Sequence, residues 1–437
     1  MKTPADKDLM PEIAVNSHGD VPPDPAQLPD EALLDLVQRR TFDFFWECAH
    51  KDTGMALDRV SSVNPNPDNN MTATGGSGFG VMALIVAVER GWLAREAAVA
   101  RLITMADFLS SAESHHGIFP HYIDGATGKA IFWGMDDAGS DVVETAFLFQ
   151  GLLCARAYFT GADDAETRLR ARINELWRRA EWSWHTPPGK NVLIWHWSPE
   201  HGWGKTHEIH GWDECLIAYV LAAASPTHPI SSEAYHQGWA VNRTFHNGQR
   251  YFDVDLPLGP EYGGPLFFSH FSFLGLDPRG LRDRYADYWQ QTRAHTLINY
   301  EHCVANPNGY KGYGPDCWGL TASDGNEGYS AYQPIWDRGV IAPTAALSSM
   351  PYAPEQSMRA LRYFTGLGER VLRRYGFIDA FNETEGWYGD DYLAIDQGAI
   401  IAMIENHRSG LLWRLFMSCP EVGAGLARLG FEGWQGA

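Results

Sequence analysis

The sequence predicts an all-α fold in which inner and outer helices form an (α/α)6 toroid. From residue 30 onward, helical patterns follow one another with loops rich in Gly, Trp, Asn and Asp between them. Two kinds of helix alternate: segment 164–184 carries its charges on one face, whereas segment 142–159 is apolar nearly all round. An irregular α-solenoid would give a similar series, but the chain lacks the fixed period of TPR, HEAT or ankyrin arrays.

Capping residues and apolar periodicity set the predicted helix boundaries. Strand-like pieces such as Arg250–Leu256 are predicted to form small hairpins at the rim of the cleft, and the long non-helical stretch 302–339 is typical of a functional loop. The predicted helices are 31–50, 78–92, 95–113, 141–160, 164–184, 213–224, 231–240, 278–299, 340–349, 354–375, 391–406 and 410–417.

Composition excludes several classes of partner. The 437 residues carry a formal net charge of −20, which argues against binding a nucleic-acid backbone or an anionic membrane. No apolar run reaches the roughly 18 residues of a membrane span. The six cysteines form no C-x-x-C pair, so they are predicted to be structural thiols rather than disulfides or zinc ligands. The oligomeric state stays open.

The first 30 residues differ in character from the rest. They are rich in Pro and Asp and lack the apolar core of a signal peptide, so we predict a flexible arm over 1–30 and a single catalytic domain over 31–437. This predicts a cytoplasmic protein as written, or a periplasmic one if a native signal has been removed.

The stretch from Trp195 to Pro229 is the most informative part of the chain. An aromatic, His-rich loop leads into a short apolar helix, and Asp213 and Glu214 stand at the junction. Flat aromatic faces beside a carboxyl group suit a sugar-binding cleft, because the ring stacks on a pyranose and the acid supplies proton transfer. The alternative is that Glu214 is only an acid favoured by the helix dipole.

Two further acidic positions interrupt apolar helices. Asp141 and Glu144 are three residues apart and share one face of a first helical turn. Asp141 could simply cap that helix, but Glu144 needs a partner or a cavity. Asp396 begins an Asp-Gln-Gly within an apolar run, where burial is costly unless it faces a pocket.

Other signals point away from metals and nucleotides. The histidines of His207-Glu-Ile-His210 are three residues apart, not four as in the H-E-x-x-H zinc motif. The glycine-rich segment 75–80 has neither P-loop nor Rossmann spacing, so it is predicted to open a helix tightly against the core. We therefore predict no metal and no cofactor.

Longer motifs carry a resemblance to a known family. Over about residues 32–422 the chain resembles the bacterial β-1,2-glucan hydrolases of glycoside hydrolase family 144, long labelled glucoamylases and related to a central domain of cyclic β-1,2-glucan synthases. The motifs are Asp141-Val-Val-Glu-Thr-Ala-Phe, Trp195-His-Trp-Ser-Pro, Gly211-Trp-Asp-Glu-Cys-Leu, Gly263-Gly-Pro-Leu-Phe-Phe, Gly275-Leu-Asp-Pro-Arg-Gly, Asp316-Cys-Trp-Gly-Leu-Thr-Ala-Ser-Asp, Ala380-Phe-Asn-Glu-Thr and Ile395-Asp-Gln-Gly.

The resemblance implies a one-domain (α/α)6 toroid without a metal, with a cleft across the ends of the inner helices. It also implies that Glu214 and Asp396 are the leading acidic candidates for catalysis. By the same resemblance, Asp141, Asp136 and Asp137 form a second acidic cluster that lines the cleft, although segment 133–141 departs from the family's spacing.

These observations predict an inverting glycosidase acting on β-1,2-glucan or its oligosaccharides. Glu214 would be the general acid and Asp396 the ionised general base, with Asp141 assisting them. The alternatives are an exo-acting, sophorose-releasing hydrolase, a transglycosylase, or a non-catalytic glucan-binding protein. The predicted substrate-binding residues are Glu144, Asp136, Asp137, His210, Trp133, Trp203, Trp212, Tyr313, Trp318, Trp387 and Tyr392.

Overall fold

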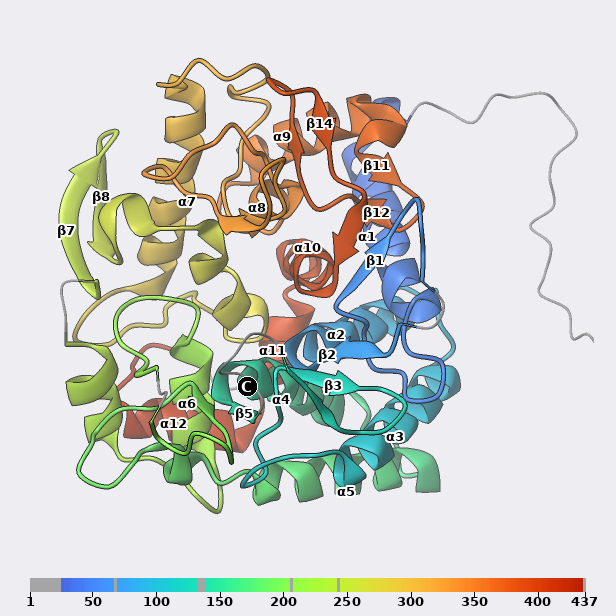
Figure 1. Cartoon of the computed structure of the whole chain (residues 1–437), viewed down its shortest axis with the longest axis vertical. Coiled ribbons are helices and arrows are strands. Elements are labelled where there is room, and N and C mark those ends of the chain that lie inside the picture. The colour runs from blue at the N-terminus through green and yellow to red at the C-terminus, as the bar shows by residue number, and fades with distance from the viewer. Residues whose placement is uncertain (1–24, 67–68, 133–138, 205–206, 242–243, 435–437) are drawn as a thin grey trace, which may run out of the picture.

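Helices dominate the structure, a computed structural model that describes residues 25–66, 69–132, 139–204, 207–241 and 244–434 (Figure 1). The all-α class is therefore confirmed. The α-helices are α1 (Asp30–Glu47), α2 (Thr74–Glu89), α3 (Arg95–Ser111), α4 (Val142–Tyr158), α5 (Asp164–Arg179), α6 (Leu216–Ala224), α7 (Tyr288–Ala305), α8 (Pro343–Leu347), α9 (Pro354–Gly366), α10 (Ala394–Arg408), α11 (Leu411–Met417) and α12 (Pro420–Arg428).

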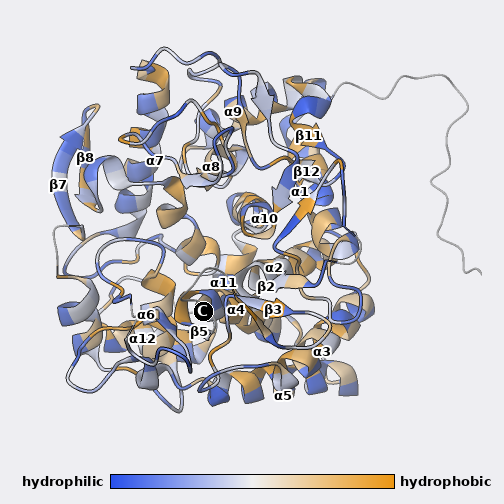
Figure 2. Ribbon diagram, in the orientation of Figure 1, coloured by the Kyte–Doolittle hydropathy of each residue, from blue (hydrophilic) through white to orange (hydrophobic). Residues whose placement is uncertain are grey.

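The strands are short and pair antiparallel in small, separate sheets. The predicted hairpin near residue 250 is present as β7–β8, which is mostly hydrophilic along β7 (Figure 2). The pairs are β1 (Arg59–Ser61) with β15 (Asp391–Leu393), β2 (Met71–Ala73) with β3 (Tyr122–Asp124) and β4 (Ala130–Ile131), β5 (Ser140–Asp141) with β6 (His196–Trp197), β7 (His246–Tyr251) with β8 (Val254–Leu258), β9 (Ala322–Ser323) with β10 (Ser330–Ala331), β11 (Leu372–Arg373) with β12 (Gly376–Phe377), and β13 (Phe381–Asn382) with β14 (Trp387–Tyr388).

Some predicted boundaries are wrong, for local reasons. The helix predicted over 278–299 begins only at Tyr288, because the Asp287 side chain accepts a hydrogen bond from the Gln290 N–H and caps the helix there. The helix predicted over 354–375 ends at Gly366, and Gly368 follows with φ +64°. Helix α12 has no counterpart among the predicted helices.

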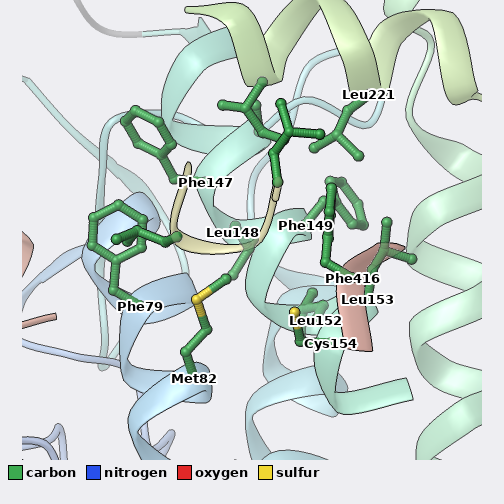
Figure 3. Packing of buried hydrophobic residues seen from close by; sticks show 14 of the residues in the cluster. Phe79, Met82, Phe147, Leu148, Phe149, Leu152, Leu153, Cys154, Leu221 and Phe416 are labelled. Carbon is green, nitrogen blue, oxygen red and sulfur yellow. The ribbon is translucent and has the colours of Figure 1, made fainter. Parts of the chain in front are cut away.

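The core is built around apolar helices. Helix α2 packs between α4 and α10, and α4 also contacts α6 and α11. Figure 3 shows side chains of four elements meeting there: Phe79 from α2, Phe147 from α4, Leu221 from α6 and Phe416 from α11. Within the described residues, no helix is both long enough and apolar enough to cross a lipid bilayer.

Polar-faced helices cover this core. Helix α5 packs against α3 and α4 through Leu169, Ile173 and Leu176, all buried, and its charged residues face outward except Glu166, which is buried and pairs with Arg95. The alternation of buried and surface helices predicted from the sequence is therefore present.

The predicted arm is only partly described, because residues 1–24 lie outside the described residues. Its last residues form a short 3₁₀ helix, η1 (Pro25–Gln27), that packs against α9. The Arg362 guanidinium of α9 donates hydrogen bonds to the carbonyl oxygens of Ala26 and Leu28, at 3.0 and 3.1 Å. All six cysteines are free thiols, as predicted.

The glycine-rich start of α2 allows backbone contact with α4. A Cβ at Gly78 would overlap the carbonyl oxygen of Phe147, and a Cβ at Gly151 would overlap that of Gly78. A Cβ at Gly76 would lie 2.8 Å from the Cβ of Ala394 on α10. These contacts confirm that the glycines serve close packing.

Replacing Gly151 by alanine is therefore expected to destabilise the protein by about 2–3 kcal/mol, because α2 and α4 would have to separate. Denaturant unfolding of Gly151→Ala measures this cost. Gly366→Ala is the matched control, since a Cβ there meets nothing within 4 Å. An equal effect of the two substitutions would contradict the interpretation.

Candidate active site

One cavity of about 530 Å³ gathers acidic side chains from distant parts of the chain. Residues at the N-terminal ends of α4 and α10, and just before α6, lie on its wall with strand and loop residues. The lining residues are Asp58, Arg59, Met71, Ala73, Gly76, His121, Tyr122, Val143, Glu144, Phe147, Trp195, Glu214, Phe267, Phe271, Ala322, Tyr329, Leu393, Ile395 and Asp396.

Glu214 lies just before α6, whose N-cap residue is Cys215. Burial raises the pKa of its carboxyl well above the ordinary value, and the nearby charge of Asp213 adds to the effect. Asp213 is held by a hydrogen bond from the Cys215 N–H to its Oδ1 at 2.9 Å. Glu214 therefore faces the cavity in surroundings that favour the neutral, protonated form of its carboxyl group.

Glu144 occupies the first turn of α4 and also faces the cavity. Its Oε2 accepts a hydrogen bond from the Gly75 N–H at 2.7 Å, and a Cβ at Gly75 would come within 2.5 Å of that oxygen. Burial raises the pKa of Glu144 to about 7, against an opposing effect of His121 and with a further increase from Asp141. The partner and the cavity predicted for Glu144 are both present.

Asp141, predicted to line the cleft and assist catalysis, does not lie on the cavity wall. Its side chain is fully buried behind the cavity wall, and its Oδ1 caps α4 by accepting the N–H groups of Val143 and Glu144, each at 2.9 Å. Its Oδ2 lies 2.9 Å from His121 Nδ1 and 3.3 Å from His196 Nε2. Burial opposes ionisation of Asp141, but these contacts lower its pKa well below the ordinary value. Asp141 therefore positions its neighbours and does not face the cavity.

Asp396 lies in the first turn of α10, 3% exposed, on the wall of the same cavity as Glu214. Burial raises its pKa well above the ordinary value, and the neighbouring carboxyl group of Asp379 raises it further. The same burial raises the pKa of Asp379 to about 7. The sequence predicts that Asp396 is ionised. In the structure, its carboxyl group instead contacts that of Asp379, and its pKa is raised.

Arg59 is the cation beside these acids. Its Nη1 lies 3.2 Å from an Asp324 oxygen and 3.0 Å from an Asp391 oxygen, and its Nε lies 3.7 Å from Asp58. Since β1 pairs with β15, Arg59 joins the strand that precedes α10 to the long loop before α8. The network fixes the cavity wall next to Asp396.

Three predicted substrate-binding residues are core residues instead. Trp212 packs against Trp239, Tyr288 and Phe273, Trp318 is fully buried, and Tyr392 packs against Phe44 and Tyr375. No ring face remains for a sugar on any of them, so these three predictions are wrong.

Four other predicted residues lie elsewhere than the cavity wall, and three are outside the described residues. Trp203 packs against Trp184, His210 contacts Glu208 and Gly238, Tyr313 donates its hydroxyl to Asp337, and Trp387 lies in β14. Asp136, Asp137 and Trp133 belong to the segment that is not described.

The aromatic part of the wall comes from residues that were not predicted as binding residues: Tyr122, Phe147, Trp195, Phe267, Phe271 and Tyr329. Trp195 stands in the loop that the sequence singles out, and Tyr329 lies within the predicted long loop. Asp58 and Arg59 carry no motif that could have identified them.

In the described part of the chain, two groups of side chains have ligand atoms within 4.8 Å of one another, as a metal site requires. They are His121, Asp141 and His196, and Asp213, Glu214 and Cys215. In the first group, Asp141 already accepts four hydrogen bonds or ion-pair contacts that account for its position. The absence of a metal stays a prediction.

Comparison with known proteins places the chain in a family. Residues 206–420 match the family described as "Putative glucoamylase". A protein of known structure with that description, from Bacteroides uniformis, is 55% identical in sequence to this chain. The two structures superpose with a TM-score of 0.91 over 93% of this chain and 98% of the Bacteroides chain. An endo-β-1,2-glucanase from Chitinophaga pinensis, solved with sophorotriose and glucose, is 51% identical, with a TM-score of 0.90 over 93% of this chain and 99% of its own.

A curated relative adds a different mode of action. The exo-β-1,2-glucooligosaccharide sophorohydrolase of Parabacteroides distasonis is 43% identical over 422 residues. The match covers 92% of this chain but only 58% of the relative. Because the Bacteroides and Chitinophaga proteins match over 93% of this chain and nearly all of their own length, the chain belongs to the bacterial β-1,2-glucan hydrolase family, glycoside hydrolase family 144.

Proposed function

We propose that this protein hydrolyses β-1,2-glucan or its oligosaccharides with inversion at the anomeric carbon. The observation that carries the proposal is that Glu214 and Asp396, 182 residues apart in the sequence, line one cavity with aromatic rings. Two carboxyl groups across a cavity are what glycoside hydrolysis requires. The buried and surface helices support an (α/α)6 toroid as the scaffold.

The linkage is proposed from the relatives, whose names specify β-1,2-linked substrates. Endo and exo action both occur among them, since the Chitinophaga protein is an endo-glucanase and the Parabacteroides protein releases sophorose. Digestion of a panel of glucans, with chromatography of the products over time, tests the linkage. Release of sophorose alone would favour exo action, whereas a ladder of oligosaccharides would favour endo action.

Glu214 serves as the general acid in this proposal. Its raised pKa keeps the proton on the carboxyl group near neutral pH, so the proton is available for the leaving oxygen. The base on the other side is the carboxylate centred on Asp396, which accepts a proton from the attacking water. Direct transfer and relay through a substrate hydroxyl or a second water are both compatible with these roles.

Glu144 and Asp141 have supporting roles. Glu144, in the first turn of α4, faces the cavity and is proposed to hold sugar hydroxyls, while Asp141 holds His121 and His196 beside it. The rings of Trp195 and Tyr122 are the proposed stacking surfaces.

Removing the carboxyl group of the general acid, Glu214, or of the general base, Asp396, is expected to lower kcat at least ~10²-fold with little change in KM. Glu214→Gln keeps the shape but has no proton to give, and Asp396→Asn cannot accept one. Steady-state kinetics on β-1,2-gluco-oligosaccharides measures both. Glu200→Gln, at an exposed position, is the control and should keep its activity; a kcat near the wild-type value in Glu214→Gln or Asp396→Asn would refute the assignment.

The stereochemistry provides a separate test. A single displacement by water predicts that the first product released from a β-1,2-glucan is the α-anomer. Proton NMR spectra recorded before mutarotation distinguish the anomers. A β-anomeric first product would mean a retaining enzyme with a carboxylate nucleophile.

Glu144 is expected to make stability depend on pH. Its folded pKa of about 7 exceeds the unfolded value of 4.5, so its contribution is complete below pH 4.5 and is lost as the pH rises through 7. Glu144→Gln removes this titration and should flatten the decline by up to about 1.4 kcal/mol per pH unit. Denaturant unfolding of both proteins between pH 4.5 and 8 measures the difference; parallel curves would contradict it.

A further inference from the structure

We propose that Asp379 is a positioning residue that shares one proton with Asp396, so that the pair, carrying a single negative charge, is the base of the reaction. This inference rests on the proposed function, because it explains how a buried acid can accept a proton from water. Asp379 lies between β12 and β13, outside the residues that line the cavity.

The contact between the two acids requires a proton. Asp379 Oδ1 and Asp396 Oδ2 are both buried, and among the described residues no N–H or hydroxyl group donates to either oxygen at normal hydrogen-bond geometry, although the Thr344 hydroxyl interacts with the Asp396 carboxyl group. The two carboxyl groups are nevertheless in hydrogen-bonding contact with each other. Since ionised carboxylates are acceptors only, one of the two must be protonated for this contact to be attractive.

Asp379 cannot turn away from Asp396. Its Oδ2 accepts a hydrogen bond from the Asp324 N–H at 2.6 Å, and its own N–H donates to the Asp391 carbonyl oxygen at 2.9 Å. Its side chain is 2% exposed, so the free oxygen has no route to solvent. Hydrogen bonds thus fix both the backbone and the carboxyl group of Asp379.

The surrounding charges favour one negative charge on the pair. Asp324 raises the pKa of Asp396, and Asp58, Tyr329, Glu144 and Glu214 line the same cavity, so a second negative charge on the pair is opposed. The Arg59 guanidinium is the nearby cation and lowers the pKa of Asp379 against the effect of burial. Arg59 also pairs with Asp324, Asp391 and Asp58, so it does not offset two negative charges on the pair, and a shared proton leaves the pair with one, as in other carboxyl dyads.

The proton balance of the reaction follows. The singly charged pair takes one proton from water, whose oxygen forms the new bond to the anomeric carbon, while the glycosidic bond breaks and Glu214 gives its proton to the leaving oxygen. The pair then holds two protons and Glu214 holds none. Loss of one proton from the pair to solvent and uptake of one by Glu214 restore the starting state.

Two variants of Asp379 test the proposal. Asp379→Asn keeps the shape and offers an amide N–H, a weaker donor to Asp396 than a carboxylic acid, so the acid limb of the kcat profile should move up by about one pH unit with KM unchanged. Asp379→Ala offers no donor, and kcat should fall at least ~10²-fold. Asp390→Asn, at a half-exposed aspartate nearby, is the matched control and should leave the profile unchanged.

A spectroscopic measurement separates proton sharing from a structural role. With ¹³C-labelled aspartate carboxyl groups, the infrared spectrum of the wild type at pH 7 should contain a protonated-carboxyl band that Asp379→Asn and Asp396→Asn each lose and Asp390→Asn keeps. A band unchanged in the first two variants, or an acid limb unmoved in Asp379→Asn, would overturn the proposal. The spectra need no substrate, so failure of the wild type to cleave β-1,2-glucan would count against the proposed function instead.

Discussion

The backbone contact between α2 and α4 is the constraint on which the site depends. Gly78 and Gly151 let the two helices meet without an intervening side chain, and this approach brings the Gly75 N–H to the Glu144 carboxyl group. A larger residue at either crossing position would separate the helices and withdraw the donor from Glu144. The same crossing carries Asp141, which caps α4, to its place behind the cavity wall.

Two opposed electrostatic effects act on the acids of the cavity. Helix N-termini favour negative charge, and Glu144 and Asp396 both lie in first turns. Burial favours the neutral form, and it is the larger effect for Glu144, Glu214 and Asp396. Asp141 shows the reverse outcome, because hydrogen bonds and charge interactions with His121 and His196 lower its pKa against the effect of burial. Hydrogen-bond donors, more than the helix dipole, therefore decide which acid is ionised.

The aromatic residues show how local sequence can mislead about function. Trp212 and Trp195 belong to the same aromatic stretch, yet Trp212 is 2% exposed in the core and Trp195 lines the cavity. Both positions satisfy the same pattern of indoles near acids. Which face of the loop meets the core depends on partners such as Tyr288, which is 76 residues farther along the chain.

The sequence by itself determined the helical class, most helix positions, and the acids whose burial is costly: an isolated carboxyl group in an apolar run signals a pocket because desolvation must be compensated locally. That reasoning identified Glu144, Glu214 and Asp396. Only the tertiary structure decided that Asp141 caps α4 and does not face the cavity, that Asp379 contacts Asp396, and that Arg59 lies beside this pair. These outcomes depend on contacts between β1, β15 and the loops before α8 and β13, and interactions between segments so far apart leave no periodic trace in the sequence.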